Sequence, residues 1–176
     1  VSHTWGMTEC MFGSSGAITA RDAARPVEEQ IPYLCMDGRQ TPGMVLEIFD
    51  DAGNRLPHDG TARGHLRVRG LWATKSYLNM PEGSALDAAG WLNTGDIATI
   101  DEDGYLRLVD RDKDLIKSGG EWISSVDIEK VACAHEDVVQ AAVIGVPHPR
   151  WQERPLLLVQ RRQGSKVTEE EILAAV

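Results

Sequence analysis

The sequence lacks several features that mark specialised classes of protein. None of its apolar runs approaches the ~20 residues that a membrane-spanning helix needs, which excludes an integral membrane protein. Its three cysteines are widely spaced and form no C-x-x-C pair, so a reducing compartment is favoured over a disulfide framework. The five histidines show no metal-ligand spacing, so a structural zinc site is not expected. The net charge of −9 disfavours a surface for nucleic acid or anionic lipid.

The composition that remains is that of a globular protein. Hydrophobic residues make up 42% and charged residues 26% of 176, enough for one compact domain or two small ones. Residues 1–42 are rich in glycine, serine and proline and predict a loop-dominated segment. Residues 43–109 predict a β-rich region, with strands at Met44–Phe49 and His65–Arg69 and a hairpin from Ile97 to Val109.

The C-terminal part has a mixed α+β pattern. Ser124–Asp127 and Thr168–Glu171 have the spacing of capping boxes and predict the starts of helices. The apolar stretches Val138–Val146 and Leu156–Val159 predict core strands. Because a charged run, D-R-D-K-D at 110–114, separates this part from the β-rich region, it predicts a domain boundary.

Three short motifs carry chemistry, and each has an ordinary alternative. W-G-M-T-E at 5–9 combines an aromatic ring, a glycine, a hydroxyl and a carboxylate, which suits a nucleotide with Mg²⁺ but also a surface loop. N-T-G-D at 93–96 ends in a carboxylate that either accepts from vicinal hydroxyls or closes an Asx turn. The run at 110–114, taken by itself, is a solvated turn between domains, as charge runs usually are.

In this order, the motifs resemble the adenylate-forming superfamily of acyl-CoA synthetases, adenylation domains of peptide synthetases and luciferases. K-S-G-G-E-W-I-S-S at 117–125 and I-G-V-P-H-P-R-W-Q-E-R-P at 144–155 resemble its medium- and long-chain fatty acyl-CoA synthetase branch. The resemblance covers essentially the whole chain. It implies an α+β fold in which residues 1–110 form the β-rich, distorted barrel-like C-terminal part of the large AMP-binding domain. Residues 111–114 would be the hinge and residues 115–176 an incomplete, mobile C-terminal lobe.

The resemblance also implies roles for residues of the first two motifs. Thr8 would contact the ATP phosphates, and Glu9 would hold the Mg²⁺ that bridges them. Trp5 stands where the family has an aromatic, most often tyrosine, that stacks on adenine. Asp96 would accept hydrogen bonds from both ribose hydroxyls. The adenine and acyl-carboxylate pocket would further include His3, Thr4 and Gly6.

Four more residues receive roles on the C-terminal side. Arg111 would reach the ribose and phosphate side of the nucleotide. Lys113 would be the hinge residue about which the C-terminal lobe rotates between the two half-reactions. Lys117 and Trp122 would approach the acyl phosphate and the nucleotide, with plain interface packing as the alternative for Trp122.

The implied reaction is that of a fatty acyl-CoA synthetase. A carboxylic acid and ATP give an acyl-adenylate and pyrophosphate, and coenzyme A then gives the thioester and AMP. The alternatives are an adenylation module that loads a carrier-protein thiol and a noncatalytic nucleotide-binding fragment. The substrates would be small molecules, the location cytoplasmic, and any homodimer would use segments outside this sequence. The phosphate-binding loop would precede Val1 and the catalytic lysine would follow Val176, so the segment alone would be inactive or nearly so.

Overall fold

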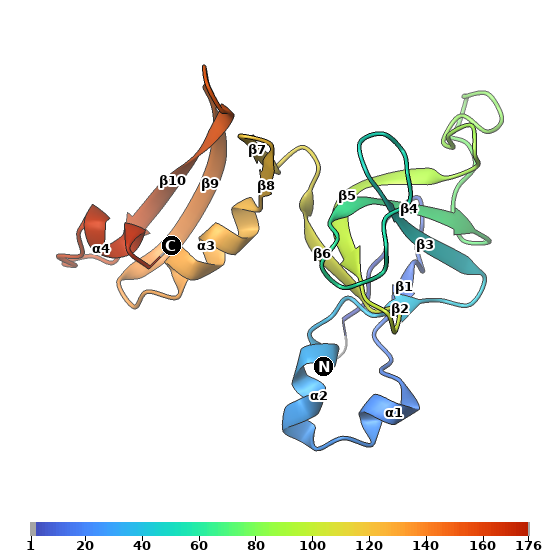
Figure 1. Ribbon diagram of the computed structural model, residues 1–176, viewed down its shortest axis with the longest axis horizontal. Coiled ribbons are helices and arrows are strands. Elements are labelled where there is room, and N and C mark those ends of the chain that lie inside the picture. The colour runs from blue at the N-terminus through green and yellow to red at the C-terminus, as the bar shows by residue number, and fades with distance from the viewer. Residues whose placement is uncertain (1–2, 176) are drawn as a thin grey trace. The chain divides into compact units, whose positions relative to one another are not determined.

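The fold is mixed α+β, as the sequence predicts, in a computed structural model that describes residues 3–175 (Figure 1). The chain divides into two units, Val1–Leu108 and Val109–Val176, and each has its own helices and antiparallel sheet. The division falls just before the charged run at 110–114. The hinge at 111–114 stays a prediction.

The first unit is built on a four-stranded sheet in the order β3-β4-β5-β6. The strands are β3 (Met44–Phe49), β4 (Gly64–Gly70), β5 (Leu92–Ile100) and β6 (Leu106–Arg111), and the last residues of β6 already belong to the second unit. The predicted strands and hairpin are confirmed, with β5 starting earlier than expected. The described strands form an open sheet rather than a closed barrel.

Alternating burial along these strands builds the core of the first unit. In β3, Met44, Leu46 and Ile48 are buried, while Val45 between them is exposed. Strands alternate faces at every residue, so this pattern places one apolar face of the sheet inward. The buried cluster also includes Trp5, Cys10, Leu66, Val68, Leu92, Ala98, Ile100 and Leu106.

The N-terminal segment contains two helices that the sequence did not predict. Between β1 (Ser14–Ser15) and β2 (Arg39–Gln40) the chain forms α1 (Ala20–Ala23) and α2 (Val27–Leu34), as Figure 1 shows. Every α2 side chain is at least partly exposed, and Pro32 lies inside the helix. Pro32 inside the segment argued against a helix, although Val27, Ile31 and Leu34 recur at helical spacing.

A buried carboxylate, Asp22, holds this helical segment to the sheet. Its oxygens accept hydrogen bonds from the Thr19 and Tyr105 hydroxyls and from Nε of Arg21 and of Arg25, and its side chain is fully buried. Hydrogen bonds from Thr19, Tyr105 and Arg21 lower the pKa of Asp22 to about 2, against an opposing effect of burial. The segment therefore depends on an ionised carboxylate.

We expect the stabilising effect of Asp22 to disappear in acid. Because its pKa is lower in the folded chain, its contribution is complete above the unfolded pKa of about 3.9 and is lost as pH falls through about 2. The difference in urea midpoint between wild type and Asp22→Asn should therefore be constant above about pH 5 and shrink between about pH 4 and 2. Glu102→Gln, which changes an exposed side chain, is the control. A difference independent of pH would contradict this account.

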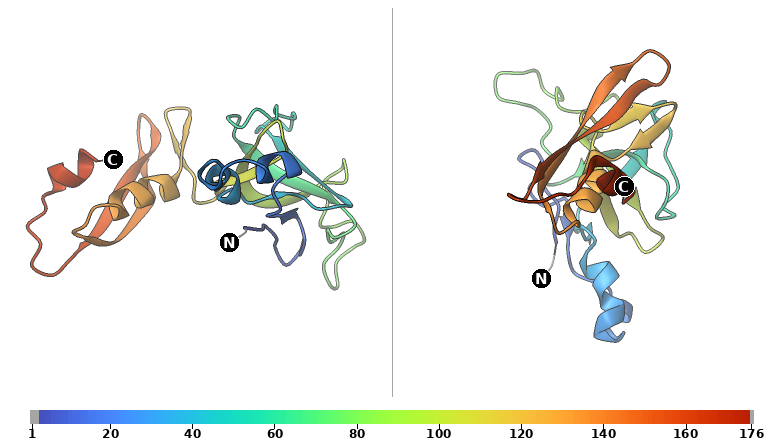
Figure 2. Two further views of the ribbon diagram at one scale, coloured as in Figure 1. Left: turned by 90° about the horizontal axis from the view of Figure 1, so that it is seen from below. Right: turned by 90° about the vertical axis from the view of Figure 1, so that its left-hand side faces the viewer.

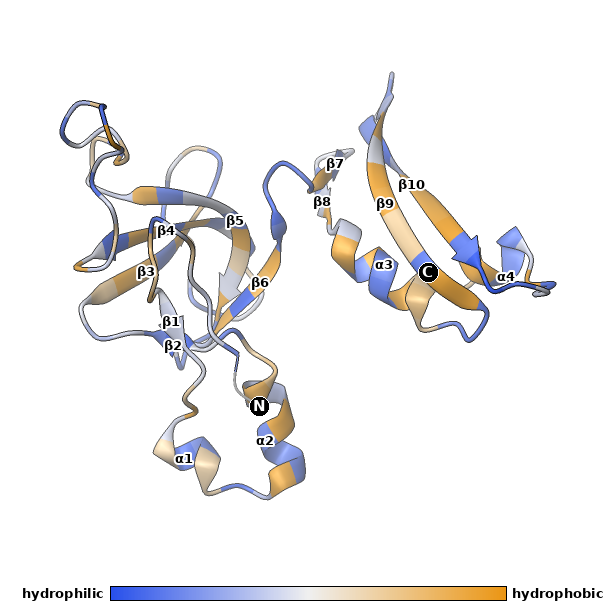
Figure 3. Ribbon diagram, turned by 180° about the vertical axis from the view of Figure 1, so that it is seen from behind, coloured by the Kyte–Doolittle hydropathy of each residue, from blue (hydrophilic) through white to orange (hydrophobic). Residues whose placement is uncertain are grey.

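The second unit has a four-stranded sheet in the order β8-β7-β10-β9. Its long hairpin joins β9 (Val138–His148) to β10 (Gln152–Arg161), and the short strands are β7 (Ile116–Ser118) and β8 (Glu121–Ile123). The predicted apolar strands are thus confirmed as parts of β9 and β10. Apolar residues recur along both strands in Figure 3, but only one face of the hairpin is buried or partly buried.

The helices of the second unit begin at the caps that the sequence predicts. Ser124 caps α3 (Ser125–Cys133), where its hydroxyl accepts from the Asp127 amide at 3.2 Å. Thr168 and Glu171 form a complete capping box at α4 (Glu169–Leu173). Helix α3 packs along β9, as the left view of Figure 2 shows, and Ala132, Val138, Val167 and Ile172 form the buried core. Within the described chain, the helices are all too short or too polar to cross a bilayer.

Candidate functional site

A tight turn presents Thr8 and Glu9 at the edge of the first unit. Met7 and Cys10 exchange two backbone hydrogen bonds of 3.0 Å, which places Thr8 and Glu9 at the tip between them. Thr8 is exposed and Glu9 is half-buried. The Tyr77 hydroxyl donates to Oε1 of Glu9 at 3.2 Å, and partial desolvation together with this carboxylate raises the pKa of Tyr77.

Trp5 lies in the core just before this turn. Two hydrogen bonds join the Trp5 backbone to Ser14. The Trp5 amide donates to the Ser14 hydroxyl at 2.8 Å, and the Ser14 amide donates to the Trp5 carbonyl at 3.0 Å. Trp5 is 6% exposed, and its indole N–H donates to Oδ2 of Asp96 at 2.9 Å. Stacking of this ring on adenine stays a prediction. Three other residues of the predicted pocket lie beside Trp5 in the sequence and are exposed: His3, Thr4 and Gly6.

Asp96 stands on a bulge of the central strand β5. The β4–β5 register passes from His65↔Ile97 to Arg67↔Asn93, so three residues of β5 oppose one of β4. Gly95 has a φ of +74°, and a Cβ there would point into open space, so the bulge needs glycine for its backbone and not for room. Such bulges redirect side chains beside functional sites.

Thr94 holds the bulge together from inside. Its hydroxyl donates to the Leu66 carbonyl at 2.9 Å and accepts from the Asp96 amide at 3.1 Å. Both Thr94 and Asp96 are buried. The N-T-G-D motif therefore acts as more than an Asx turn, because it fixes a buried carboxylate at a defined point of the sheet.

The charged run of the second unit forms a turn. The amides of Asp114 and Leu115 both donate to the Arg111 carbonyl, at 3.0 and 2.9 Å, so exposed Lys113 lies inside this turn. Asp110 ties the start of the turn to α3, because its Oδ2 accepts from the Ser125 amide and hydroxyl at 2.9 Å each. These hydrogen bonds fix the chain on either side of Lys113, and Lys113 itself lies in a short exposed loop.

Lys117 and Trp122 form a cross-strand pair on β7 and β8. The ammonium group of Lys117 lies 5.6 Å from the centre of the Trp122 ring and 3.6 Å from Oδ1 of Asp112. The Lys117 amide donates to Oε2 of Glu153 at 3.0 Å, which anchors this strand to β10. Because Lys117 and Asp112 are both partly exposed, their ion pair contributes little to stability and can be exchanged for another anion.

Gly119 and Gly120 form the two-residue turn between β7 and β8. Their φ angles are +62° and +89°, as the turn of a twisted hairpin requires. A Cβ on Gly119 would lie 2.8 Å from the Trp151 ring, whereas a Cβ on Gly120 would meet open space. The Gly119 amide also donates to the Trp151 carbonyl at 3.0 Å. Gly119 is therefore required for both conformation and packing.

The two glycines should differ in their tolerance of alanine. Gly120→Ala should destabilise the chain by about 1–2 kcal/mol, the cost of a left-handed alanine. Gly119→Ala should cost at least about 1 kcal/mol more, because its methyl group also displaces the Trp151 ring. Equilibrium urea unfolding followed by tryptophan fluorescence measures both variants against wild type. Equal losses would mean that the contact with Trp151 is unimportant.

The structure thus brings some of the predicted residues together within each unit. Trp5 contacts Asp96 and lies in the same segment as Thr8 and Glu9, and Lys117 contacts Trp122. Among the described residues, no group of three or more potential ligands could hold a metal ion, so Glu9 is a single carboxylate at its turn. Sequence reasoning missed the contact of Tyr77 with Glu9, because only tertiary folding brings residues 68 positions apart together.

These features define a protein with a buried acceptor on a bulged strand, a hydroxyl–carboxylate turn and a lysine–tryptophan hairpin. Residues 127–176 match the family described as AMP-binding enzyme C-terminal domain. The chain belongs to the adenylate-forming superfamily, whose AMP-binding C-terminal domain it carries.

The comparisons with individual proteins agree with this family. The chain is 48% identical over 172 residues to 3-methylmercaptopropionyl-CoA ligase of Ruegeria lacuscaerulensis, covering 97% of this chain and 32% of that protein. It is 44% identical over 173 residues to medium-chain-fatty-acid–CoA ligase of Ectopseudomonas oleovorans, covering 98% and 32%. The crystal structure of ATP-bound MatB from Rhodopseudomonas palustris matches with a TM-score of 0.77 at 32% identity, covering 97% and 32%. The chain therefore spans about a third of the length of the curated relatives it matches.

Proposed function

We propose that this chain forms part of an AMP-forming acid–thiol ligase. The ligase joins a carboxylic acid to the AMP part of ATP with release of pyrophosphate, and then passes the acyl group from the acyl-adenylate to coenzyme A with release of AMP. The observation that carries the proposal is the buried Asp96 carboxylate, held on the β5 bulge beside the segment of Thr8 and Glu9. Similarity to relatives that are named as CoA ligases supports the reaction class.

Asp96 would recognise the ribose of ATP. A carboxylate only accepts hydrogen bonds, and its two oxygens together offer about four acceptor positions. A pair of vicinal hydroxyls fits this acceptor set, and such charge-assisted bonds are strong where water is excluded. Burial of Asp96 supplies that environment, with 4% of the residue exposed.

Thr8 and Glu9 would meet the triphosphate. The Thr8 hydroxyl is an exposed donor for a phosphate oxygen. Mg²⁺ is commonly held by one or two carboxylates together with substrate phosphates, so the single carboxylate of Glu9 fits this ion. When bound, Mg²⁺ would neutralise phosphate charge as pyrophosphate leaves. Tyr77 would keep the Glu9 carboxylate oriented through its hydroxyl.

The second unit would supply cations and movement. Lys117 would exchange its weak contact with Asp112 for the acyl phosphate, while Trp122 limits the directions that the lysine can take. Arg111 would contact the ribose and phosphate side with its fork of donors. Lys113 would be the point of rotation between adenylation and thioester formation, since it lies in a short exposed turn.

The acid and the acceptor are the finer parts of the proposal. We propose a medium- or long-chain fatty acid, supported by the fatty-acid ligase among the relatives, and free coenzyme A as the thiol. Thioester formation assayed in parallel with coenzyme A and with a phosphopantetheinyl carrier protein separates these acceptors. Titration calorimetry with a nonhydrolysable acyl-adenylate analogue separates a nucleotide-binding protein from one without this site.

The scattered free thiols support a cytoplasmic location.

Removing the Asp96 carboxylate should impair the use of ATP. In the ligase that contains this sequence, Asp96→Ala should lower kcat/KM for ATP by about 30-fold or more, which is about 2 kcal/mol, because the ribose loses its acceptor. Steady-state kinetics with varied ATP measures this effect. Asp51→Ala, which removes an exposed carboxylate of the same unit, is the control. Unchanged kcat and KM for ATP would remove Asp96 from the site.

Restricting the backbone at Lys113 should impair the change between half-reactions. Lys113→Pro fixes φ at about −65° and restricts Asp112 as well, so rotation at this turn is blocked. We expect Lys113→Pro to slow the two half-reactions, measured as ATP–pyrophosphate exchange and as thioester formation from added acyl-adenylate, to different extents. The rate of the complete reaction should fall at least about tenfold. Lys113→Ala, which leaves the backbone free, is the matched control. Two half-reactions at normal speed in the proline variant would contradict the hinge.

A further inference from the structure

The indole N–H of Trp5 is aimed at the carboxylate proposed to bind ribose. Nε1 of Trp5 lies 2.9 Å from Oδ2 of Asp96, across 91 positions of sequence. The exposed fractions of the two residues are 6% and 4%. A hydrogen bond to an ionised acceptor in so dry a place is stronger than the same bond in water, and it orients the group that accepts it.

Thr94 acts on the backbone of Asp96, whereas Trp5 acts on the carboxyl end of its side chain. Thr94 holds the bulge through bonds to the Leu66 carbonyl and the Asp96 amide, at 2.9 and 3.1 Å. These bonds set the position of the Asp96 backbone, and neither of them involves its carboxyl group. The indole N–H supplies a donor at the far end of the side chain.

Trp5 is itself a rigid donor. Its backbone is bonded in both directions to Ser14, at 2.8 and 3.0 Å. Its ring lies so close to Gly13 that a Cβ there would come within 2.1 Å of Cζ3. The backbone hydrogen bonds and the contact with Gly13 restrict the position of the ring. The ring therefore fixes the direction from which Asp96 accepts a hydrogen bond.

We propose that Trp5 is a positioning residue that sets ribose recognition by Asp96, an inference that rests on the proposed function of this carboxylate. Indole only donates, so it permits a single arrangement, in which Oδ2 accepts from Trp5. The ribose hydroxyls would then bind at acceptor positions of the carboxylate that Trp5 does not use. The side chain that was predicted to stack on adenine thereby acts through Asp96 on the sugar.

Deleting the N–H should therefore weaken selection for the ribose hydroxyls. In the ligase that contains this sequence, Trp5→Phe should raise KM for ATP about tenfold, equivalent to about 1.4 kcal/mol, with kcat within about twofold. The preference for ATP over 2′-deoxy-ATP should fall by a similar factor. A purely structural role for Trp5 would lower the active fraction and leave this preference unchanged.

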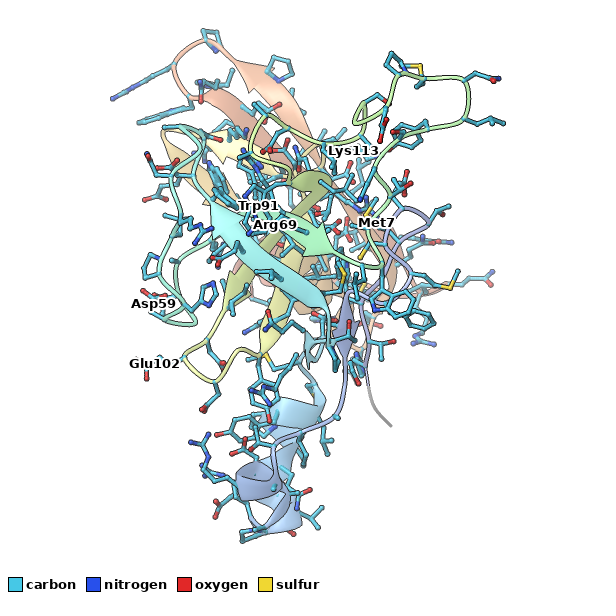
Figure 4. The ribbon with its side chains drawn as sticks, turned by 90° about the vertical axis from the view of Figure 1, so that its right-hand side faces the viewer. Met7, Asp59, Arg69, Trp91, Glu102 and Lys113 are labelled. Atoms are coloured by element: carbon cyan, nitrogen blue, oxygen red, sulfur yellow. The ribbon has the colours of Figure 1, made fainter. Side chains whose placement is uncertain are left out.

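Trp91→Phe is the matched control. Trp91 is 3% exposed in the same unit, where its ring packs against Phe49 and beneath the Arg69 guanidinium, 4.5 Å from the ring centre (Figure 4). This variant should keep both KM for ATP and the preference for ATP. If Trp5→Phe fails to fold, β-(3-benzothienyl)alanine at position 5 keeps the shape of indole without its N–H. It should reproduce the loss of preference.

Asp96→Asn separates this inference from the function on which it rests. If Asp96→Asn leaves the preference for ATP over 2′-deoxy-ATP intact, the ribose role of Asp96 fails. If Asp96→Asn abolishes the preference while both Trp5 replacements retain it, the ribose role stands and the positioning role of Trp5 is overturned. Support requires that Trp5→Phe lower the preference in the parent ligase and have no further effect in the Asp96→Asn background.

Discussion

The hydrogen bond between the Trp5 indole and the Asp96 carboxylate connects two distant parts of the first unit. Trp5 precedes the turn that carries Thr8 and Glu9, and Asp96 stands on the bulge of β5, so one bond relates both motifs. Burial makes this bond strong and also makes it necessary, because a carboxylate withdrawn from water needs donors. The proposed nucleotide chemistry of the first unit depends on this pair.

The second unit uses polar anchors of a different kind. Asp110 bonds the start of α3, and Glu153 bonds the backbone of Lys117, so both ends of the segment from 110 to 117 are fixed by carboxylates. Between these anchors the chain forms only a short turn around Lys113. A segment held at its ends and exposed in its middle can change backbone angles there with little loss of packing.

Local patterns predicted much of the secondary structure. Alternation of polar and apolar residues marked β4, and serine and threonine caps marked the starts of α3 and α4, because these signals act within a few residues. The same reasoning missed α2, whose side chains all remain at least partly exposed. That helix lies in the segment held by buried Asp22, whose partner Tyr105 lies 83 positions away, and no local pattern records such a contact.

The order and chemistry of the motifs determined the family of this protein, because W-G-M-T-E, N-T-G-D and the block at 117–125 specify hydroxyl, carboxylate and amine groups in a set sequence. Tertiary structure decided how those groups are held. The bulge at Asp96, its bond to Trp5 and the contact of Tyr77 with Glu9 all join residues far apart in the chain. Such contacts depend on strand register and on packing between elements. Both are determined by the fold as a whole and not by the residues of one segment.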